Sequence, residues 1–247
     1  MTEQQKHFPE FYVTAEQPCP YLPGRSERKL FTHLTPDKPI HLIDNLLRGG
    51  FRRSQSIAYM PYCEGCRACI SVRILVNDFK PTRNMRRINN ANRDLRAATS
   101  EPHPSPEQYA LFRRYIDARH ADGGMADMSV LDYSTMIEET VIDSVMTEYR
   151  VKSDRPLDLE ASEGELKAAV FCDHLSDGIS MVYSYYTPDE PTRSLGTYMI
   201  LDHIERARKL GLPYLYLGYW IEGSPKMDYK ARFAPQEHLT PQGWQRA

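Results

Sequence analysis

The stretch GISMVYSYYTPDEPTRSLGTYMILDHIERARKLGLPYLYL, residues 178–217, decides the fold of this chain. Its first nine residues alternate between apolar or aromatic and smaller side chains, a pattern that predicts a β-strand. After a loop with two prolines, residues 195–209 predict a helix that is closed by Gly211. The apolar run at 214–217 predicts another strand. The segment therefore predicts a strand, a loop, a long helix and a second strand, in that order.

Two more strands are predicted before this segment, at Ser144–Val151 and Glu165–Cys172. The turn Leu175–Gly178 contains Asp-Gly and predicts a hairpin. Antiparallel strands, a loop, a long helix and a further strand follow one another in the acyltransferase core of the GCN5-related N-acetyltransferases. We therefore expect an α+β chain whose C-terminal lobe, residues 126–247, has an acetyltransferase-like fold.

The remaining residues, 1–125, are expected to form a smaller N-terminal lobe. Residues 1–38 are rich in proline and have few periodic apolar positions, so we expect them to wrap over a core without forming one. A helix is predicted at 40–48, where Gly49 and Gly50 end it. Further elements are predicted as strands at 56–60 and 70–76, and as helices after Pro81 and from Ser105 to Arg119.

Composition and charge narrow the class of protein. Of the 247 residues, 41% are hydrophobic and 26% are charged, as in an ordinary globular protein. No run approaches the roughly 18 apolar residues of a membrane helix, and the N-terminus has no basic segment before an apolar stretch, so we expect a cytoplasmic protein without membrane contact. The net charge of −2 argues against a general nucleic-acid binder. Residues 78–96 nevertheless hold six basic and two acidic side chains, which form either a phosphate-binding face or an ordinary solvated surface.

The cysteines are unevenly placed. Cys63, Cys66 and Cys69 stand three residues apart, directly before a predicted strand. A Cys-x-x-Cys step on a tight turn lets two sulfurs converge on one metal ion, and the third cysteine can add a ligand. A fourth ligand would be Cys19 or Cys172, but Cys172 falls in an apolar strand, where a buried and inert thiol is expected. The alternative is a set of reduced thiols packed on a turn.

The start of the long helix half-matches the coenzyme A site of acetyltransferases. The segment 193–198, RSLGTY, resembles Gln/Arg-x-x-Gly-x-Gly/Ala, whose backbone N–H groups hold a pyrophosphate at a helix N-terminus. Tyr198 stands where that pattern has a small residue, and its ring would crowd the anion. The half-match supports the fold and argues against acetyl-coenzyme A as a donor.

Aromatic and cationic residues concentrate after the last predicted strand. Tyr219 and Trp220 are expected at the end of that strand, and Lys226, Tyr229 and Lys230 on one face of a short helix. Aromatic rings beside cations suit a terminal adenosine and its phosphates. The alternative is an aromatic core patch with surface lysines.

Five motifs are spread in order over nearly the whole chain. They are CPYLPGR at 19–25, SQSIAY at 54–59, CEGCRAC at 63–69, SLGTY at 194–198 and YLYLGYWI at 214–221. Together they resemble the bacterial aspartate/glutamate leucyltransferases, which are relatives of the eukaryotic arginyl-tRNA-protein transferases. The resemblance implies an enzyme that moves leucine from leucyl-tRNA to the N-terminal Asp or Glu of acceptor proteins, marking them for degradation by the N-degron pathway. Ser224 stands where many relatives are expected to have cysteine, so we do not expect an essential nucleophile there.

Aminolysis of the ester in leucyl-tRNA is downhill, so we expect no required cofactor. The acceptor amine has a pKa near about 7.7 to 8.0 and is partly neutral at working pH, so positioning matters more than a strong base. The first candidates for a base are Glu222 and Tyr219, and the weaker ones are Asp202 and His174.

The substrates require cations in two places. For the carboxylate of the acceptor, the candidates are Arg73, Lys230 and Arg232. For the tRNA acceptor stem and its 3′ end, they are Arg83, Arg86, Arg87, Lys226 and Trp220. The resemblance also implies a structural zinc or iron–sulfur cluster at Cys19, Cys63, Cys66 and Cys69, which would fasten the N-terminal segment to the strand that follows the cluster.

Three other functions are compatible with the sequence. Arginyl transfer would need a carboxylate in the amino-acid pocket, where leucyl transfer needs an apolar one. A metal-stapled RNA-binding module without catalysis would fit the cysteine cluster and the basic segment. Acetyl transfer from acetyl-coenzyme A is weakened by Tyr198.

Overall fold

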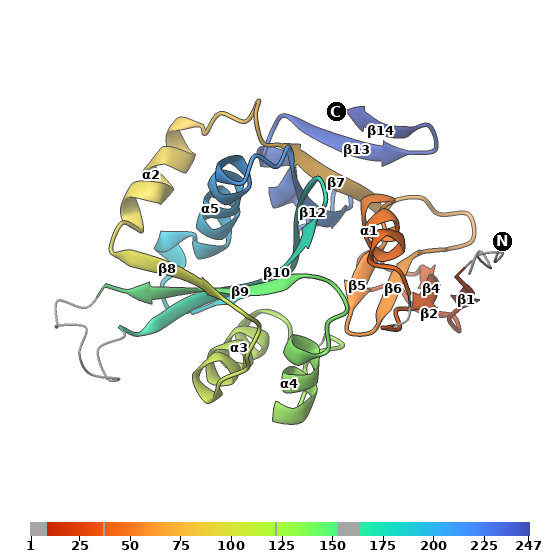
Figure 1. Cartoon of the computed structure of the whole chain (residues 1–247), viewed down its shortest axis with the longest axis horizontal. Helices are drawn as coiled ribbons and strands as arrows, with labels where there is room; N and C mark the ends of the chain where they lie inside the picture. Colours follow the sequence, from red (N-terminus) through yellow and green to blue (C-terminus); the bar gives the residue numbers. More distant parts are fainter. Residues whose placement is uncertain (1–8, 37, 122, 153–163) are drawn as a thin grey trace, which may run out of the picture.

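The computed structural model describes residues 9–36, 38–121, 123–152 and 164–247, and it is built around one large sheet (Figure 1). Eight strands lie in the order β14-β13-β7-β12-β11-β10-β9-β8. They are β7 (Ile70–Leu75), β8 (Leu95–Ser100), β9 (Ser144–Val151), β10 (Leu166–Leu175), β11 (Gly178–Tyr186), β12 (Tyr214–Trp220), β13 (Gln236–Thr240) and β14 (Gly243–Arg246). Neighbouring strands are antiparallel except β11 and β12, which are parallel.

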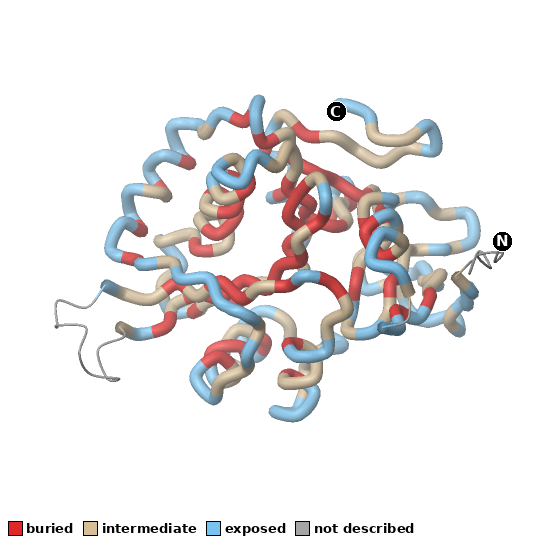
Figure 2. Tube along the Cα trace, viewed as in Figure 1, coloured by how far each residue is buried: buried red, intermediate tan, exposed pale blue. Residues whose placement is uncertain are grey.

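Helices cover both faces of the large sheet. On one face lie α2 (Arg83–Ala91) and α5 (Leu195–Lys209), and on the other lie α3 (Pro106–Arg119) and α4 (Val130–Glu138) (Figure 1). Successive side chains of a strand point to opposite faces, so β10 places Val170 in the core under α5 and Phe171 in the core under α3 and α4. Buried positions accordingly follow the strands and the inner sides of the helices (Figure 2). Among the described residues, no helix has the length and apolar character needed to cross a membrane.

A smaller sheet lies at one end of the molecule. Its strands run in the order β1 (Tyr12–Val13), β4 (Lys29–His33), β6 (Ile57–Pro61) and β5 (Arg52–Ser54), and β2 (Gln17–Pro18) pairs separately with β3 (Ser26–Glu27). Helix α1 (Ile40–Arg48) joins this sheet to the large one, because its Ile43 and Leu47 share a core with Ala58 of β6 and with Leu175 and Tyr216 of the large sheet. Apolar contacts therefore hold the small sheet against the large one.

The parallel strands β11 and β12 diverge soon after they begin. They pair only where Gly178–Ser180 faces Tyr214–Tyr216. On its other side, β12 pairs with β7 through a register shift between Tyr216 and Gly218, where Gly218 has a φ of +74° that favours glycine. From Met181 onward, β11 has β10 as its strand partner and no longer pairs with β12. We call the region between the two diverging strands the splay.

The α+β class and the order of strands, loop, helix and strand at residues 144–217 are confirmed by this topology. The prediction for residues 1–38 is wrong in the part that the structure describes, because β4 pairs within the small sheet and Leu34, 1% exposed, belongs to its core. The boundary at residue 125 does not follow an edge of the large sheet, since the earlier strands β7 and β8 pair within it. The predicted helix at 226–230 is also wrong.

A single short turn of 3₁₀ helix, η2 (Asp228–Arg232), takes the place of that helix. Lys226 precedes the turn and is exposed, whereas Lys230 is buried. The two lysines therefore do not share a face, and they are available for different contacts.

Candidate active site

The strands of the large sheet are less closely covered at the splay. In β11, residues 182–184 and Tyr186 are half-buried in the part of the strand that no longer pairs with β12. Tyr219 and Trp220 at the end of β12 are also half-buried. A substrate can approach both strands here, so we built the candidate site from the side chains around the splay.

Arg52 of the small sheet reaches into the splay. Its guanidinium donates hydrogen bonds to the carbonyl oxygens of Met181, at 2.8 Å, and of Val182, at 3.1 Å, which belong to the part of β11 that β12 has left. On the opposite side, the guanidinium rests on Gly218, where a Cβ atom would lie 2.8 Å from its carbon. The absence of a side chain at Gly218 therefore makes room for Arg52.

Lys230 lies on the β12 side of the splay. Its side chain is buried, with 6% of the residue exposed, and the ammonium donates a hydrogen bond to the carbonyl oxygen of Tyr219. Burial, followed by the charge of Arg52, lowers the pKa of Lys230 from 10.5 to about 7. Within the described ranges, neither Lys230 nor Arg52 forms an ion pair with a carboxylate.

Tyrosines line the same region. The rings of Tyr115 and Tyr186 have centroids 4.9 Å apart, and Tyr186 packs on Gly196 at the start of α5, with 3.3 Å between its ring and the position of a Cβ atom there. Burial and then the neighbouring Tyr186 raise the pKa of Tyr229, which is 39% exposed. These rings offer an apolar and aromatic wall beside the two cations.

The two first candidates for a base lie in different surroundings. The hydroxyl of Tyr219 donates to the carbonyl oxygens of Gly50, at 3.0 Å, and Tyr59, at 3.2 Å, and burial raises its pKa far above the ordinary value. Tyr219 therefore ties the small sheet to β12 and does not accept protons near neutral pH. Glu222 is exposed in the turn after β12.

The weaker candidates for a base lie in other networks. Asp202 of α5 accepts hydrogen bonds from the hydroxyl of Tyr149, at 2.7 Å, and from Arg206, at 2.6 Å. His174 of β10 lies 2.9 Å from Asp143. Neither contact belongs to the splay.

Of the three cations predicted to bind the acceptor carboxylate, the structure brings Lys230 alone into the splay. Arg73 of β7 is buried and already bound to Glu237, at 2.7 Å, and it is stacked between the rings of Tyr214 and Trp244, at 3.5 Å and 4.3 Å from their centroids. Such a guanidinium is a structural element of the sheet. Arg232 ends the η2 turn with its side chain exposed.

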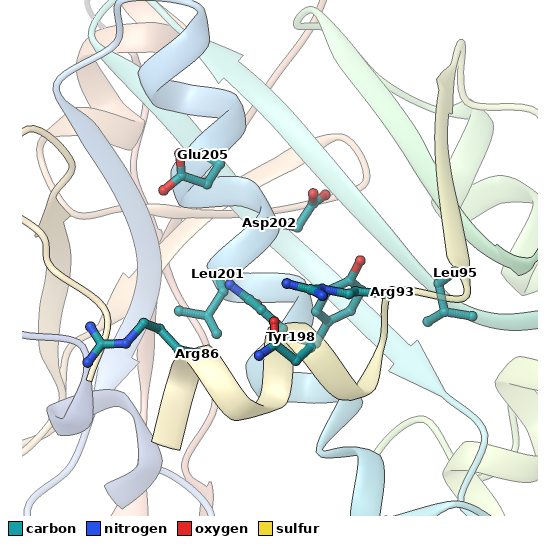
Figure 3. A pocket seen from close by; sticks show the side chains of 9 residues that line it. Arg86, Arg93, Leu95, Tyr198, Leu201, Asp202 and Glu205 are labelled. Atoms are coloured by element: carbon teal, nitrogen blue, oxygen red, sulfur yellow. The ribbon is translucent and has the colours of Figure 1, made fainter. Parts of the chain in front are cut away.

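The residues predicted to bind tRNA fall in two places. Arg83, Arg86 and Arg87 are exposed on α2, and a cleft of about 680 Å³ lies between α2 and α5, where Arg86 and Arg93 are among the lining side chains (Figure 3). Trp220 packs on His238, with centroids 5.1 Å apart, and its buried indole N–H has no acceptor among the described residues. The structure therefore separates a basic helix from an aromatic strand end.

The four cysteines are neighbours without forming a metal centre. Burial and then the nearby thiols of Cys19, Cys63 and Cys66 raise the pKa of Cys69 to about 12. Within the described residues, however, no three His, Cys, Asp or Glu side chains converge as metal ligands. The thiols as placed do not fit a zinc or iron–sulfur site, so no chemical step is assigned to one. Cys172 is fully buried, as predicted.

The N-terminus of α5 is closed by ion pairs. Arg193 binds Asp94, at 2.5 Å, and Glu190, at 3.1 Å, and it also contacts Asn92. Because these carboxylates already engage the guanidinium of Arg193, it is not available to pair with a pyrophosphate at this helix N-terminus. This arrangement agrees with the argument from Tyr198 against acetyl-coenzyme A.

Two family models match the chain, the arginine-tRNA-protein transferase N terminus over residues 17–87 and the arginine-tRNA-protein transferase C terminus over residues 107–240. The chain belongs to this transferase family. It is 58% identical over 246 residues to an aspartate/glutamate leucyltransferase of Brucella ovis and 57% identical over 246 residues to that of Xanthobacter autotrophicus. Each match covers 100% of this chain and 99% of the relative. Among solved structures, the crystal structure of FemX matches 81% of this chain and 65% of its own length, at 10% identity and a TM-score of 0.49.

Arg52 is absent from the transferase residues predicted from the sequence. It stands two positions before the motif at 54–59, and nothing in that motif indicates that β5 crosses to the splay. The sequence feature that could have indicated Arg52 is Gly218, within the motif at 214–221. The lack of a side chain there leaves room for the guanidinium.

Proposed function

We propose that this protein transfers leucine from leucyl-tRNA to the N-terminal Asp or Glu of acceptor proteins, which marks them for degradation. The observation that carries the proposal is the match to aspartate/glutamate leucyltransferases over the full length of the chain, at 58% identity. The splay supports it, because it places beside aromatic rings two cations that have no carboxylate partner within the described ranges.

The chemistry requires few catalytic groups. The α-nitrogen of the acceptor attacks the carbonyl carbon of the leucyl ester, a C–N bond forms, and the C–O bond to the terminal ribose of the tRNA breaks. The proton that the amine loses balances the one that the ribose hydroxyl gains. Because the ester is activated and the amine is partly neutral, the main contribution of the protein is to hold the two reactants in contact.

We place the tRNA along α2 and its 3′ end at the splay. The exposed Arg83, Arg86 and Arg87 can pair with phosphates of the acceptor stem, since their guanidinium groups have no carboxylate partners among the described residues. At the end of β12, the half-buried ring of Trp220 is our candidate for stacking on the terminal nucleotide. Lys226, exposed before η2, can meet the same end of the tRNA.

A peptide assay tests the function. A peptide that begins with Asp is incubated with leucyl-tRNA or with arginyl-tRNA, and mass spectrometry follows its N-terminus. We expect addition of one leucine and no addition of arginine, with the tRNA 3′ hydroxyl set free. Addition of arginine without leucine would overturn leucyl transfer, and an unchanged peptide under conditions of proven tRNA binding would favour an RNA-binding module.

The zinc or iron–sulfur site at Cys19, Cys63, Cys66 and Cys69 stays a prediction. The spacing of the cysteines in the sequence supports it, while their placement in the structure requires a rearrangement before three of them could meet at one metal ion. Metal analysis of protein purified without chelator, in air and without oxygen, tests the site. Stoichiometric zinc or iron that is lost in a Cys66→Ser variant would support it.

A further inference from the structure

We propose that Arg52 and Lys230 together bind the side-chain carboxylate of the acceptor's N-terminal residue, and that Arg52 is a determinant of the preference for acidic acceptors. This inference rests on the proposed aminoacyl transfer. It starts from two cations that the structure brings to successive residues of β12, where Arg52 rests on Gly218 and Lys230 is bonded to Tyr219.

The electrostatic argument is that neither cation has a carboxylate partner in the part of the chain that the structure describes. A buried ammonium or guanidinium is costly unless an anion and hydrogen bonds compensate it. Elsewhere in the chain this rule is followed, since the buried Arg53 binds Asp173 at 2.6 Å and the buried Arg73 binds Glu237. Arg52 and Lys230 instead have carbonyl partners, and the charge of Arg52 further disfavours the charged form of Lys230. An anion bound by both would offset the burial of Lys230 and the repulsion between the two cations.

The hydrogen-bonding groups suit a carboxylate. One terminal nitrogen of Arg52 is engaged by the carbonyl oxygens of Met181 and Val182, and its other terminal nitrogen has a 3.5 Å contact with the hydroxyl of Ser180. A guanidinium has five N–H donors and an ammonium has three, so donors remain on both groups after these contacts. Two cations that each offer a donor can hold the two oxygens of one carboxylate.

The position of Arg52 and Lys230 fits the way in which an acceptor would approach the leucyl ester. The splay begins where β11 loses β12 as its strand partner, and Arg52 and Lys230 lie on either side of it. If the acceptor side chain is held there, its α-amine extends from the pair into the opening, where the leucyl ester can be presented. Acidity would then be recognised at the place where the new bond forms.

The experiment compares acceptor peptides that differ only in charge. Peptides beginning with Asp, Asn, Glu or Gln are assayed at saturating leucyl-tRNA with the wild-type protein and with Arg52→Gln, Arg52→Lys and Lys230→Met. We expect kcat/KM for the Asp peptide to fall about tenfold to hundredfold in Arg52→Gln and Lys230→Met, mainly through KM, as for the loss of a charged hydrogen bond. The Asn peptide should change by no more than about threefold, and Arg52→Lys should keep part of the preference for Asp.

A matched control is Arg246→Gln, which removes an exposed guanidinium that pairs with Asp78 at 3.4 Å. It should leave the ratio of Asp to Asn rates unchanged. For every variant, circular dichroism, melting temperature and tRNA binding are measured, so that loss of folding is separated from loss of selectivity. If Arg52→Gln does not fold, the comparison rests on Arg52→Lys and Lys230→Met.

Two outcomes separate this inference from the proposed function. If folded Arg52→Gln and Lys230→Met lower the rates for Asp and Asn peptides by the same factor, the carboxylate site is wrong although leucyl transfer stands. If the wild type transfers arginine but its preference for Asp depends on Arg52 and Lys230, the site is right and the donor is different.

Discussion

Arg52 and Arg53 are neighbours on β5, but they lie in opposite environments. Arg53 is enclosed and donates to both carboxylate oxygens of Asp173, at 2.8 Å and 2.6 Å, with Ser144 close to the same acid. Arg52 points the other way, as alternate strand residues do, and is bound to carbonyl oxygens in the splay. One arginine has its anion built into the fold, and the other can receive one from a substrate. The same residue type is therefore structural or functional according to whether the chain supplies its counter-charge.

The largest expected effect follows from removing the built-in anion. Asp173→Ala leaves Arg53 buried without a partner, and the loss of one member of a buried pair costs about 3 to 5 kcal/mol. We expect the free energy of unfolding to fall by that amount in chemical denaturation. As a control, Asp117→Ala removes the exposed partner of Arg113, at 2.7 Å, and should cost no more than about 1 kcal/mol. Equal effects of the two substitutions would contradict the structural role of Arg53.

A second prediction concerns the exposed arginines of α2, which have no carboxylate partner among the residues that the structure describes. Replacing Arg83, Arg86 and Arg87 together by Gln should raise KM for leucyl-tRNA about tenfold to hundredfold, and reduce the salt dependence of tRNA binding by about two units of slope, because fewer counterions are released. The rate at saturating tRNA should remain. The comparison is Arg113→Gln with Arg114→Gln, since both guanidinium groups already bind carboxylates on α3 and the β11–α5 loop. If the α3 variant weakens tRNA binding as much, α2 is not the specific docking helix.

The smallest effect, taken per pH unit, is a pH dependence of stability at Lys230. Its pKa in the fold is about 7, below the ordinary 10.5, so between these values the unfolded chain holds more protons than the folded one. The free energy of unfolding of the wild type should therefore rise with pH in this window, by at most about 1.4 kcal/mol per pH unit from this group. Lys230→Met lacks that slope and should be the more stable protein at low pH, with its advantage shrinking as the pH rises.

Chemical denaturation of both proteins at about pH 6.5, 8 and 9.5 measures this difference. A stability difference that stays constant across the series would mean that Lys230 is not a buried cation. If it shrinks as expected, the wild type keeps Lys230 at a cost to its stability, as functional sites commonly do.

The sequence predicts the elements whose signals are local. Residues 195–209 form α5, and residues 106–119 form α3 with Ser105 as its cap. Both helices could be predicted because apolar spacing and capping depend on residues that are close together in the sequence. The motifs also locate Lys230 near the end of β12. Strands of two or three residues, such as β1 and β5, carry too little periodicity to be predicted, although they build the small sheet.

Long-range pairing explains what the sequence does not reveal. Arg73 is a reasonable candidate for a substrate until Glu237 and two aromatic rings are found around it, and these partners lie far away in the chain. Arg52 shows the converse. It becomes a candidate for substrate binding only because β11 and β12 diverge beside its side chain. Whether a charge is paired is a property of the tertiary structure, and a single sequence does not state it.

The contact between Arg52 and Met181 joins positions 129 residues apart, and Lys230 is supplied only near the end of the chain. Contacts between positions so far apart in the sequence form slowly in folding, because the entropy cost of closing a long loop must be met before the contact adds stability. If Arg52 and Lys230 bind the acceptor as proposed, a nascent or partly unfolded molecule lacks a complete acceptor site even where α2 has already formed. Local opening of the small sheet would then displace Arg52 and remove the discrimination between acceptors while the large sheet stays folded.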